Sequence, residues 1–79
     1  MLFKEAISKR IYELCMIYDY TPNKLAELSS VAPSTLQDML TCKVSNPSSY
    51  VIYRICKTLN ISIKEFYDSD LFNFDVIED

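Results

Sequence analysis

The side chains that could do chemistry in this sequence are carboxylates, hydroxyls, lysines, arginines and three cysteines, because histidine and glycine are both absent. Without histidine, the chain lacks the usual general base, the usual activator of a serine or cysteine nucleophile and a common metal ligand. Without glycine, it lacks the loops whose backbone amides cradle phosphates. No pair of acids stands in an apolar setting that would tune it for proton transfer. We therefore expect no enzyme and no cofactor.

The cysteines form neither a metal-binding pattern nor a disulfide framework. Cys15, Cys42 and Cys56 are odd in number and far apart, and no CxxC occurs. Cys15 and Cys56 fall at apolar helix positions, where we expect small core residues, whereas Cys42 should be more exposed. No metal site is expected, and a redox role for Cys42 stays open as the less favoured reading.

Length and composition predict one small cytoplasmic domain. The chain has 79 residues, 49% of them hydrophobic and 24% charged, which suits one compact core. These values fit neither a disordered chain nor a membrane span. The first four residues lack the long apolar segment of a signal peptide, so a cytoplasmic protein is expected.

Charge is distributed unevenly along the chain, whose formal net charge is −3. Residues 1–64 hold eight basic residues against five acids, a balance of +3, whereas residues 65–79 hold six acids and no base, a balance of −6. An acidic tail on a mildly basic body is compatible with a nucleic-acid partner, which a uniformly acidic surface would repel.

The spacing of apolar residues predicts an all-α chain. Residues 2–18 carry apolar side chains at three- and four-residue intervals, which is typical of an amphipathic helix. Thr21 and Pro22 suit the start of a second, short helix, and Pro33 suits the start of a third. The expected inward positions are Leu25, Ala26 and Leu28 in the second helix and Leu36, Met39 and Leu40 in the third.

The second half of the chain predicts two more helices and a tail. Residues 41–47 form a loop, because the residue before Pro47 is disfavoured in a helix. A fourth helix starts after Ser48 or Ser49, and its inward residues are Ile52, Ile55, Cys56 and Leu59. Ser62 and Glu65 form a capping box for a fifth. We divide the chain into a domain of residues 1–67 and an acidic, apolar tail of residues 68–79, which could pack against the first helix or a second subunit.

The interruption between the second and third helices indicates a helix-turn-helix. Two short helices that cross steeply around a tight turn place the second of them in the major groove of DNA. Ala26 supplies the small residue needed where the helices approach. The apolar residues that would hold the crossing angle are Leu25, Val31, Leu36 and Met39. We predict a compact five-helix bundle with this motif at helices two and three.

An ordered set of residues extends this motif to most of the chain. The set is Arg10-Ile11, Leu14, Thr21, Leu25-Ala26-Glu27, Val31, Ser34-Thr35-Leu36, Asn46-Pro47, Ile52, Ile55, Leu59, Ile61-Ser62 and Glu65-Phe66. In this order it resembles the lambda-repressor-like, Cro-like helix-turn-helix domain, also called the XRE family, over residues 6–66. The resemblance implies a five-helix bundle that binds operator DNA as a dimer, with the third helix reading the bases.

The resemblance also implies which residues meet DNA. By position, the groove-facing residues are Pro33, Ser34, Gln37 and Asp38, those near phosphates are Thr35 and Lys43, and those that approach the backbone from the second helix are Asn23 and Lys24. Ser34, Thr35 and Gln37 could hydrogen-bond base edges or phosphates, glutamine being suited to adenine. The alternative is a polar helix face in water. Asp38 could accept from a cytosine amino group or belong to the solvated surface.

Three positions depart from the family pattern. Pro22 stands where a glutamine often supports a DNA contact, and it has no amide proton. Ser30 stands where glycine is common in the turn, and we expect it to adopt the left-handed conformation at a cost of roughly 1 kcal/mol. Cys42 stands where a glycine often ends the third helix, so we expect an irregular helix end there.

We predict a cytoplasmic, bacterial or phage, sequence-specific DNA-binding transcriptional regulator, which inserts helix three in the major groove of double-stranded DNA as a homodimer. The alternative is a protein-interaction module on the same fold, with weak or lost DNA binding and a protein partner bound through the C-terminal tail. Tyr12, Tyr53, Met16 and Ile17 exceed what one core stripe needs and suggest a subunit interface.

Overall fold

The computed structural model describes residues 1–79 as five α-helices and one short 3-10 helix, without strands. The elements are α1 Phe3–Tyr18, α2 Pro22–Leu28, α3 Pro33–Leu40, α4 Ser49–Leu59, α5 Ile63–Tyr67 and the 3-10 helix η1 Asp70–Phe72. The predicted all-α bundle, with a helix-turn-helix at its second and third helices, is confirmed. No helix has the length and apolar content needed to cross a bilayer.

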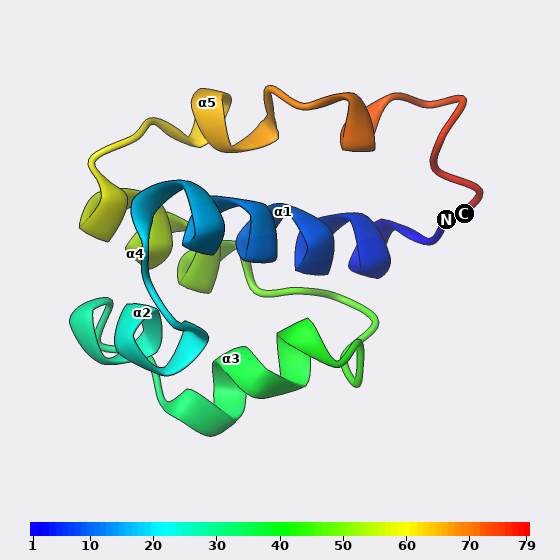
Figure 1. The fold of residues 1–79 in the computed structure, drawn as a ribbon. Helices are drawn as coiled ribbons and strands as arrows, with labels where there is room; N and C mark the ends of the chain where they lie inside the picture. Colours follow the sequence, from blue (N-terminus) through cyan, green and yellow to red (C-terminus); the bar gives the residue numbers. More distant parts are fainter.

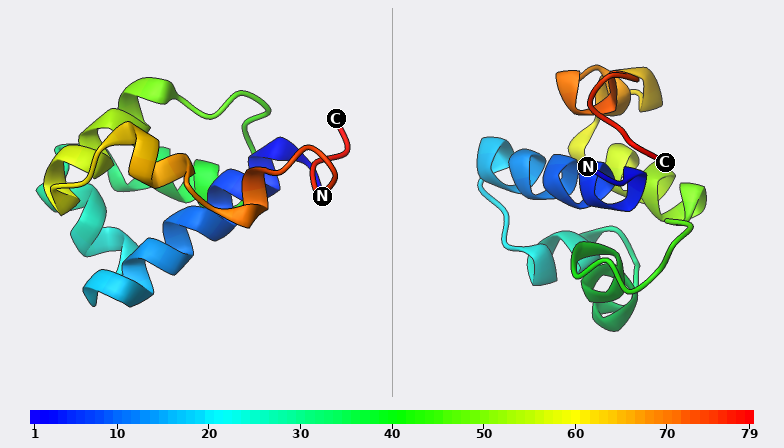
Figure 2. Two further views of the ribbon diagram at one scale, coloured as in Figure 1. Left: turned by 90° about the horizontal axis from the view of Figure 1, so that it is seen from above. Right: turned by 90° about the vertical axis from the view of Figure 1, so that its right-hand side faces the viewer.

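The helices are arranged in three layers around α1. Figure 1 shows α2 and α3 on one side of α1, and α5 with η1 on the opposite side. The right-hand view of Figure 2 shows the same order, with α4 beside α1 in the middle layer. One cluster of buried apolar side chains joins the layers, and its most enclosed members are Ile7, Ile11, Leu25, Leu36, Ile55 and Phe66.

The predicted capping residues begin three of the helices. The Thr21 hydroxyl accepts from the amide of Lys24 at 3.1 Å, so it caps α2 as expected. Of the two serines that could cap α4, Ser48 does so, accepting from the Val51 amide at 3.3 Å. The capping box of α5 is confirmed, because the Ser62 hydroxyl accepts from the Glu65 amide at 3.0 Å and the Glu65 carboxylate accepts from the Ser62 amide at 3.1 Å.

Four helices end with a residue other than glycine in the left-handed conformation. Asp19, Ser30, Cys42 and Asn60 have φ values of 55–61°, and in each case the next amide donates to the carbonyl five residues earlier. These bonds form the Schellman motif. The expected conformation of Ser30 is confirmed. The expectation of an irregular end at Cys42 is wrong, because a left-handed cysteine costs only roughly 1–2 kcal/mol and the motif's backbone bonds form around it.

The inward face of α2 differs from the prediction at one position. Leu25 and Ala26 are buried as expected, but Leu28 is 45% exposed and the prediction that it faces inward is wrong. Ser29, one helical turn after Leu25, takes the buried place and is only 1% exposed. Leu28 was predicted to face inward because it is hydrophobic. At the last turn of α2, however, it is the Ser29 side chain that points toward α4.

The tail packs against α1 of its own chain, which is one of the two arrangements left open by the sequence. The Phe72 ring contacts those of Phe3 and Tyr67, with centroid separations of 6.3 and 4.9 Å. The amide of Glu78 donates to the carbonyl of Met1 at 2.9 Å. The two ends of the chain therefore lie side by side, as both figures show (Figures 1 and 2).

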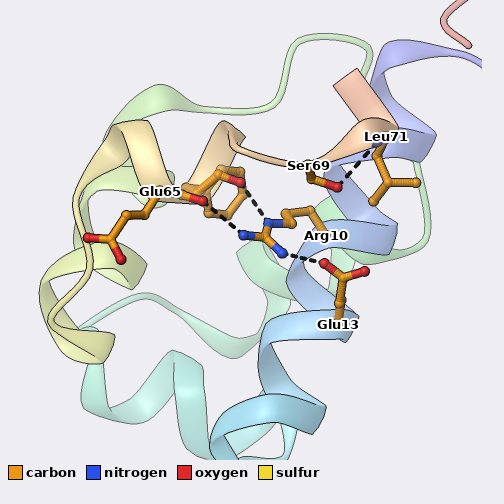
Figure 3. Close-up of polar contacts among 6 residues, drawn as sticks. Arg10, Glu13, Glu65, Ser69 and Leu71 are labelled. Atoms are coloured by element: carbon orange, nitrogen blue, oxygen red, sulfur yellow. Dashed lines mark hydrogen bonds and ion pairs between the residues drawn. The ribbon is translucent and has the colours of Figure 1, made fainter. Parts of the chain in front are cut away.

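Arg10 joins α1 to the end of α5 (Figure 3). Its Nε donates to the carbonyl of Phe66 at 2.7 Å and its Nη2 to that of Glu65 at 2.8 Å, while Nη1 pairs with the carboxylate of Glu13. A guanidinium at the last carbonyls of a helix satisfies acceptors that the helix leaves free and complements its dipole. Arg10 thus holds the layer that carries the tail.

Candidate nucleic-acid interface

The angle between α2 and α3 is set by small and apolar residues at their crossing. Ala26, the small residue expected where the two helices approach, is buried, with 1% exposure. The four side chains expected to hold the crossing angle are all buried, namely Leu25, Val31, Leu36 and Met39. Since α3 packs on both α1 and α2, the helix is fixed along its inner side and its other side is free.

Polar residues of α4 hold the turn of the motif in place. Arg54 Nε donates to the carbonyl of Ser29 at 2.9 Å, and the hydroxyls of Ser29 and Thr58 lie 2.8 Å apart in a hydrogen bond. The Thr58 hydroxyl donates its proton to the carbonyl of Arg54 at 3.1 Å, so it accepts from the Ser29 hydroxyl. We call these three residues the turn clamp. The turn clamp was not predicted from the sequence, because residues 25 or more positions apart give no periodic signal.

The far end of α3 is held by α1. The buried hydroxyl of Ser8 donates to the carbonyl of Leu40 at 2.7 Å. The thiol of Cys42 lies 3.7 Å from the carbonyl of Lys4, a weaker contact of the same kind. The end of α3 is thus attached to α1, and the turn that precedes the helix is attached to α4.

Most of the predicted contact residues lie on the free side of this helix. Pro33, Ser34, Thr35 and Gln37 are exposed, whereas Asp38 is half-buried. Their spacing on α3 places Pro33, Ser34 and Gln37 on one face, away from the buried Leu36, Met39 and Leu40. The face offers hydroxyl and amide groups, which can both donate and accept hydrogen bonds.

The other three predicted residues flank this face. Asn23 and Lys24 are exposed in the first turn of α2, and Lys43 is exposed just after the end of α3. Lys24 Nζ lies 3.8 Å from a Glu27 carboxylate oxygen, an exposed pair that is worth little and easily exchanged. These two lysines supply positive charge near α3. Arg54 is bound to the Ser29 carbonyl in the turn before α3, whereas Arg10 is bound at the end of α5.

The acidic part of the chain lies away from α3. Residues 65–79 hold six acids and no base. Figures 1 and 2 place this segment on the side of α1 opposite to α2 and α3. The repulsion between these acids and a polyanion at α3 is weakened by distance and by salt, since the Debye length is only about 8 Å at physiological ionic strength.

No cluster of three or more histidine, cysteine, aspartate or glutamate side chains is arranged to hold a metal ion. Cys15 and Cys56 are buried core residues, as expected, and Cys42 is half-buried. Burial raises the pKa of the Cys15 and Cys56 thiols, so both stay protonated at neutral pH and are poor nucleophiles.

Comparison with known proteins agrees with this geometry. A family model for the Cro/C1-type helix-turn-helix DNA-binding domain matches residues 10–70, which include all of α2 to α5 and η1's first residue. Neither the curated proteins nor the solved structures contain a match to the chain. The match covers most of the sequence and confirms the resemblance to lambda-repressor-like and Cro-like domains. The chain therefore belongs to the Cro/C1-type helix-turn-helix DNA-binding domain family.

Proposed function

We propose that the protein is a sequence-specific DNA-binding transcriptional regulator that inserts α3 into the major groove. The observation that supports this most is the exposed polar face of α3, in a chain of a DNA-binding family, on a helix whose end is bound to α1 and whose preceding turn is bound to α4. An α-helix fits the major groove, where each base pair presents a distinct pattern of donors and acceptors. We assign no catalysis and no cofactor to this protein, and we place it in the cytoplasm with its DNA.

Each candidate residue has a proposed role. Pro33, Ser34, Gln37 and the exposed part of Asp38 face the base edges, Gln37 being suited to adenine and Asp38 to the amino group of cytosine. Phosphates are contacted by Asn23, Lys24, Thr35 and Lys43. If the two lysines neutralise about two phosphates per subunit, the logarithm of affinity falls with the logarithm of salt concentration with a slope of about −1.8.

We infer that the protein acts as a homodimer on a two-fold-related operator. Four side chains that the core does not need are exposed, Tyr12 at 44%, Met16 at 83%, Ile17 at 64% and Tyr53 at 43%. Exposed apolar side chains of this size are candidates for a subunit interface. Analytical ultracentrifugation tests this inference, because Ile17→Glu should shift a dimer to monomer. In this proposal residues 1–67 form the DNA-binding unit and residues 68–79 an appended tail.

The test is fluorescence anisotropy of a labelled random duplex pool, titrated with protein at several salt concentrations. We expect saturable, salt-sensitive binding that the double substitution Ser34→Glu/Gln37→Glu weakens at least a hundredfold, because two carboxylates would face the DNA. The matched control is Asn73→Glu/Phe74→Glu, which adds the same charge at two exposed positions of the tail. It should change affinity less than threefold.

Two results would contradict the proposal. One is the absence of binding at low salt by protein that circular dichroism shows to be folded, which would favour a protein-interaction module. The other is equal weakening by both double substitutions, since that would mean net charge, rather than contact through α3, decides the affinity.

A further inference from the structure

The tail forms an open pocket at the end of the molecule where the two termini meet. It has a volume of about 470 Å³ and lies between the start of α1, the end of α5 and the last residues of the chain. Its lining residues are Phe3, Tyr67, Phe72, Phe74, Ile77 and Asp79. We call it the tail pocket. Five of its six lining side chains are apolar, so it suits an apolar ligand group.

The walls of the tail pocket are held in place by contacts within the chain. Phe72 stacks edge-on against Tyr67, with ring centroids 4.9 Å apart, and also contacts Phe3. The carboxylate of Asp79 accepts from the amide of Phe3 at 2.9 Å. A pocket formed in advance binds more tightly, because less conformational freedom is lost when a ligand enters.

One wall of the tail pocket is left without any partner in the chain. The Phe74 side chain is 97% exposed, although a phenylalanine is among the residues most often buried. Aromatic side chains, phenylalanine among them, are enriched at the cores of protein–protein interfaces. The pocket therefore offers both a hollow and a projecting ring to the same partner.

The charges around the pocket select the kind of partner. Asp75 follows Phe74, and Glu78 and Asp79 follow Ile77, within a segment whose balance is −6. A second copy would bring two such segments together, and DNA would meet the same repulsion. A chain segment that carries lysine or arginine beside its apolar group is attracted instead.

We propose that the tail pocket docks a segment of a partner protein in which one large apolar or aromatic side chain is flanked by lysine or arginine. The apolar side chain fills the hollow against Phe72 and Phe74, and the flanking cations pair with Asp75 and Asp79, because the Glu78 carboxylate already lies 3.5 Å from the terminal ammonium of Met1. Because α3 lies on the other side of α1 (Figures 1 and 2), DNA and this partner can be bound together. The inference does not depend on DNA binding by α3.

The experiment is selection of a displayed library of random 12-residue peptides on the full-length protein, followed by affinity measurement with labelled copies of the enriched peptides. We expect enriched sequences to carry an aromatic or large aliphatic residue flanked by lysine or arginine. Phe74→Ser should weaken their binding at least tenfold. The matched control is Tyr50→Ser, which removes an aromatic side chain that is 65% exposed and does not line the pocket. It should change affinity less than twofold.

A second variant tests the electrostatic part of the proposal. Asp75→Lys should weaken the same peptides about fivefold at low salt and should reduce the dependence of their affinity on salt. Because Asp75 and Phe74 are both exposed, circular dichroism should show both variants folded.

Several results would overturn the proposal. Enrichment of acidic peptides, peptides that bind Phe74→Ser as well as the parent protein, or no enrichment would each do so. Self-association that Phe74→Ser abolishes would also do so, since the occupant would then be a second copy. Peptide binding is measured without DNA, so a failure to bind DNA would not affect it. The two proposals can therefore fail independently of each other.

Discussion

The surface of α3 and the surface of the tail differ in chemistry and lie on opposite sides of α1 (Figures 1 and 2). The α3 surface presents hydroxyl and amide groups with lysines beside them, whereas the tail surface presents aromatic rings among acids. The formal net charge of −3 is an average over these two surfaces. Net charge is therefore a poor guide to the partners of this protein, because each partner meets only one surface.

The two surfaces are also held by different contacts. The α3 side depends on buried apolar residues and on the turn clamp of Ser29, Arg54 and Thr58. The tail side depends on Arg10 and on contacts between the two ends of the chain. A substitution at Arg10 should therefore affect the tail side alone, and a substitution at Arg54 the α3 side alone.

The largest effect is expected at the tail side. Arg10→Met should lower the free energy of unfolding by about 2–3 kcal/mol, because two charge-assisted hydrogen bonds to helix-end carbonyls are lost. Urea denaturation followed by circular dichroism measures this loss. For a domain of this size the melting temperature should fall by about 10–20 °C.

The control for Arg10→Met is Glu13→Gln. The Glu13 side chain is 47% exposed, so its ion pair with Arg10 should contribute less than about 1 kcal/mol. Equal losses in the two variants would show that the ion pair, and not the helix-end contact, stabilises this side. At a temperature where both are folded, DNA affinity should stay within threefold of the parent protein.

At the turn clamp we expect a smaller loss of stability than at Arg10, but a larger loss of DNA affinity. Arg54→Met should lower the free energy of unfolding by about 1–2 kcal/mol, since one hydrogen bond to a partly buried carbonyl is removed. DNA affinity should fall at least tenfold, because the turn that orients α3 is loosened.

The relevant comparison for Arg54→Met is Arg10→Met at matched fractions of folded protein. If Arg10→Met weakens DNA binding as much as Arg54→Met does, the two surfaces are coupled and the separation described above is wrong. Anisotropy titration of both variants, with parallel circular dichroism, decides between the two.

A gain in stability is expected at the turn itself. Ser30 and Cys42 have φ values of 55° and 61°, which favour glycine. Ser30→Gly should raise the free energy of unfolding by about 0.5–1 kcal/mol. Cys42→Gly should raise it by less, because the contact between its thiol and the Lys4 carbonyl is lost.

Asn60→Gly is the control for these glycine substitutions. Asn60 has a φ value of 56°, but asparagine tolerates the left-handed conformation better than serine or cysteine. It should therefore gain less than Ser30→Gly in the same urea titration. A loss of stability in Ser30→Gly would mean that serine relieves its strain by a contact that glycine cannot make.

The smallest change in stability at neutral pH is expected from the buried thiols and Tyr67, because these groups ionise only at alkaline pH. Burial raises the pKa of Cys15 and Cys56 above the ordinary 9.0, and burial also raises the pKa of Tyr67 above 10.0. These groups lose their protons at a lower pH in the unfolded chain than in the folded one. The free energy of unfolding therefore keeps its full value below pH 9 and decreases as the pH rises further. Thermal unfolding between pH 7 and pH 11 should show this decline.

The control for the pH dependence is Cys15→Ala/Cys56→Ala/Tyr67→Phe. Removing the three groups should make the alkaline decline shallower while leaving the shape of the curve near neutral pH unchanged. An equally steep decline in this variant would assign the effect to other groups.

The local features of the fold were predictable from nearby residues. Apolar spacing located the helices, and Thr21, Ser62 and Glu65 form the expected caps, because a cap depends on residues only three positions apart. The exposed positions of Ser34, Thr35 and Gln37 agree with their placement opposite the apolar stripe of α3. Their contact with DNA remains a prediction.

The failures concern features that depend on distant partners. Leu28 is more hydrophobic than Ser29, yet Ser29 is the buried residue, because Arg54 and Thr58 provide its hydrogen bonds. Arg10 was recognised only as part of a family pattern, whereas its contacts with α5 lie 55 and 56 residues away. Cys42 is the exception, because the backbone hydrogen bonds that outweighed the preference for glycine there join residues only three and five positions apart.

Helix positions, helix starts and the segregation of acids into residues 65–79 followed from the order of the amino acids alone, since each depends on short-range spacing or composition. Tertiary packing decided which side of α1 carries that acidic segment, which polar groups hold α3 and where the tail pocket forms. These outcomes depend on contacts between residues far apart in the chain, and such contacts exist only once the helices have packed together.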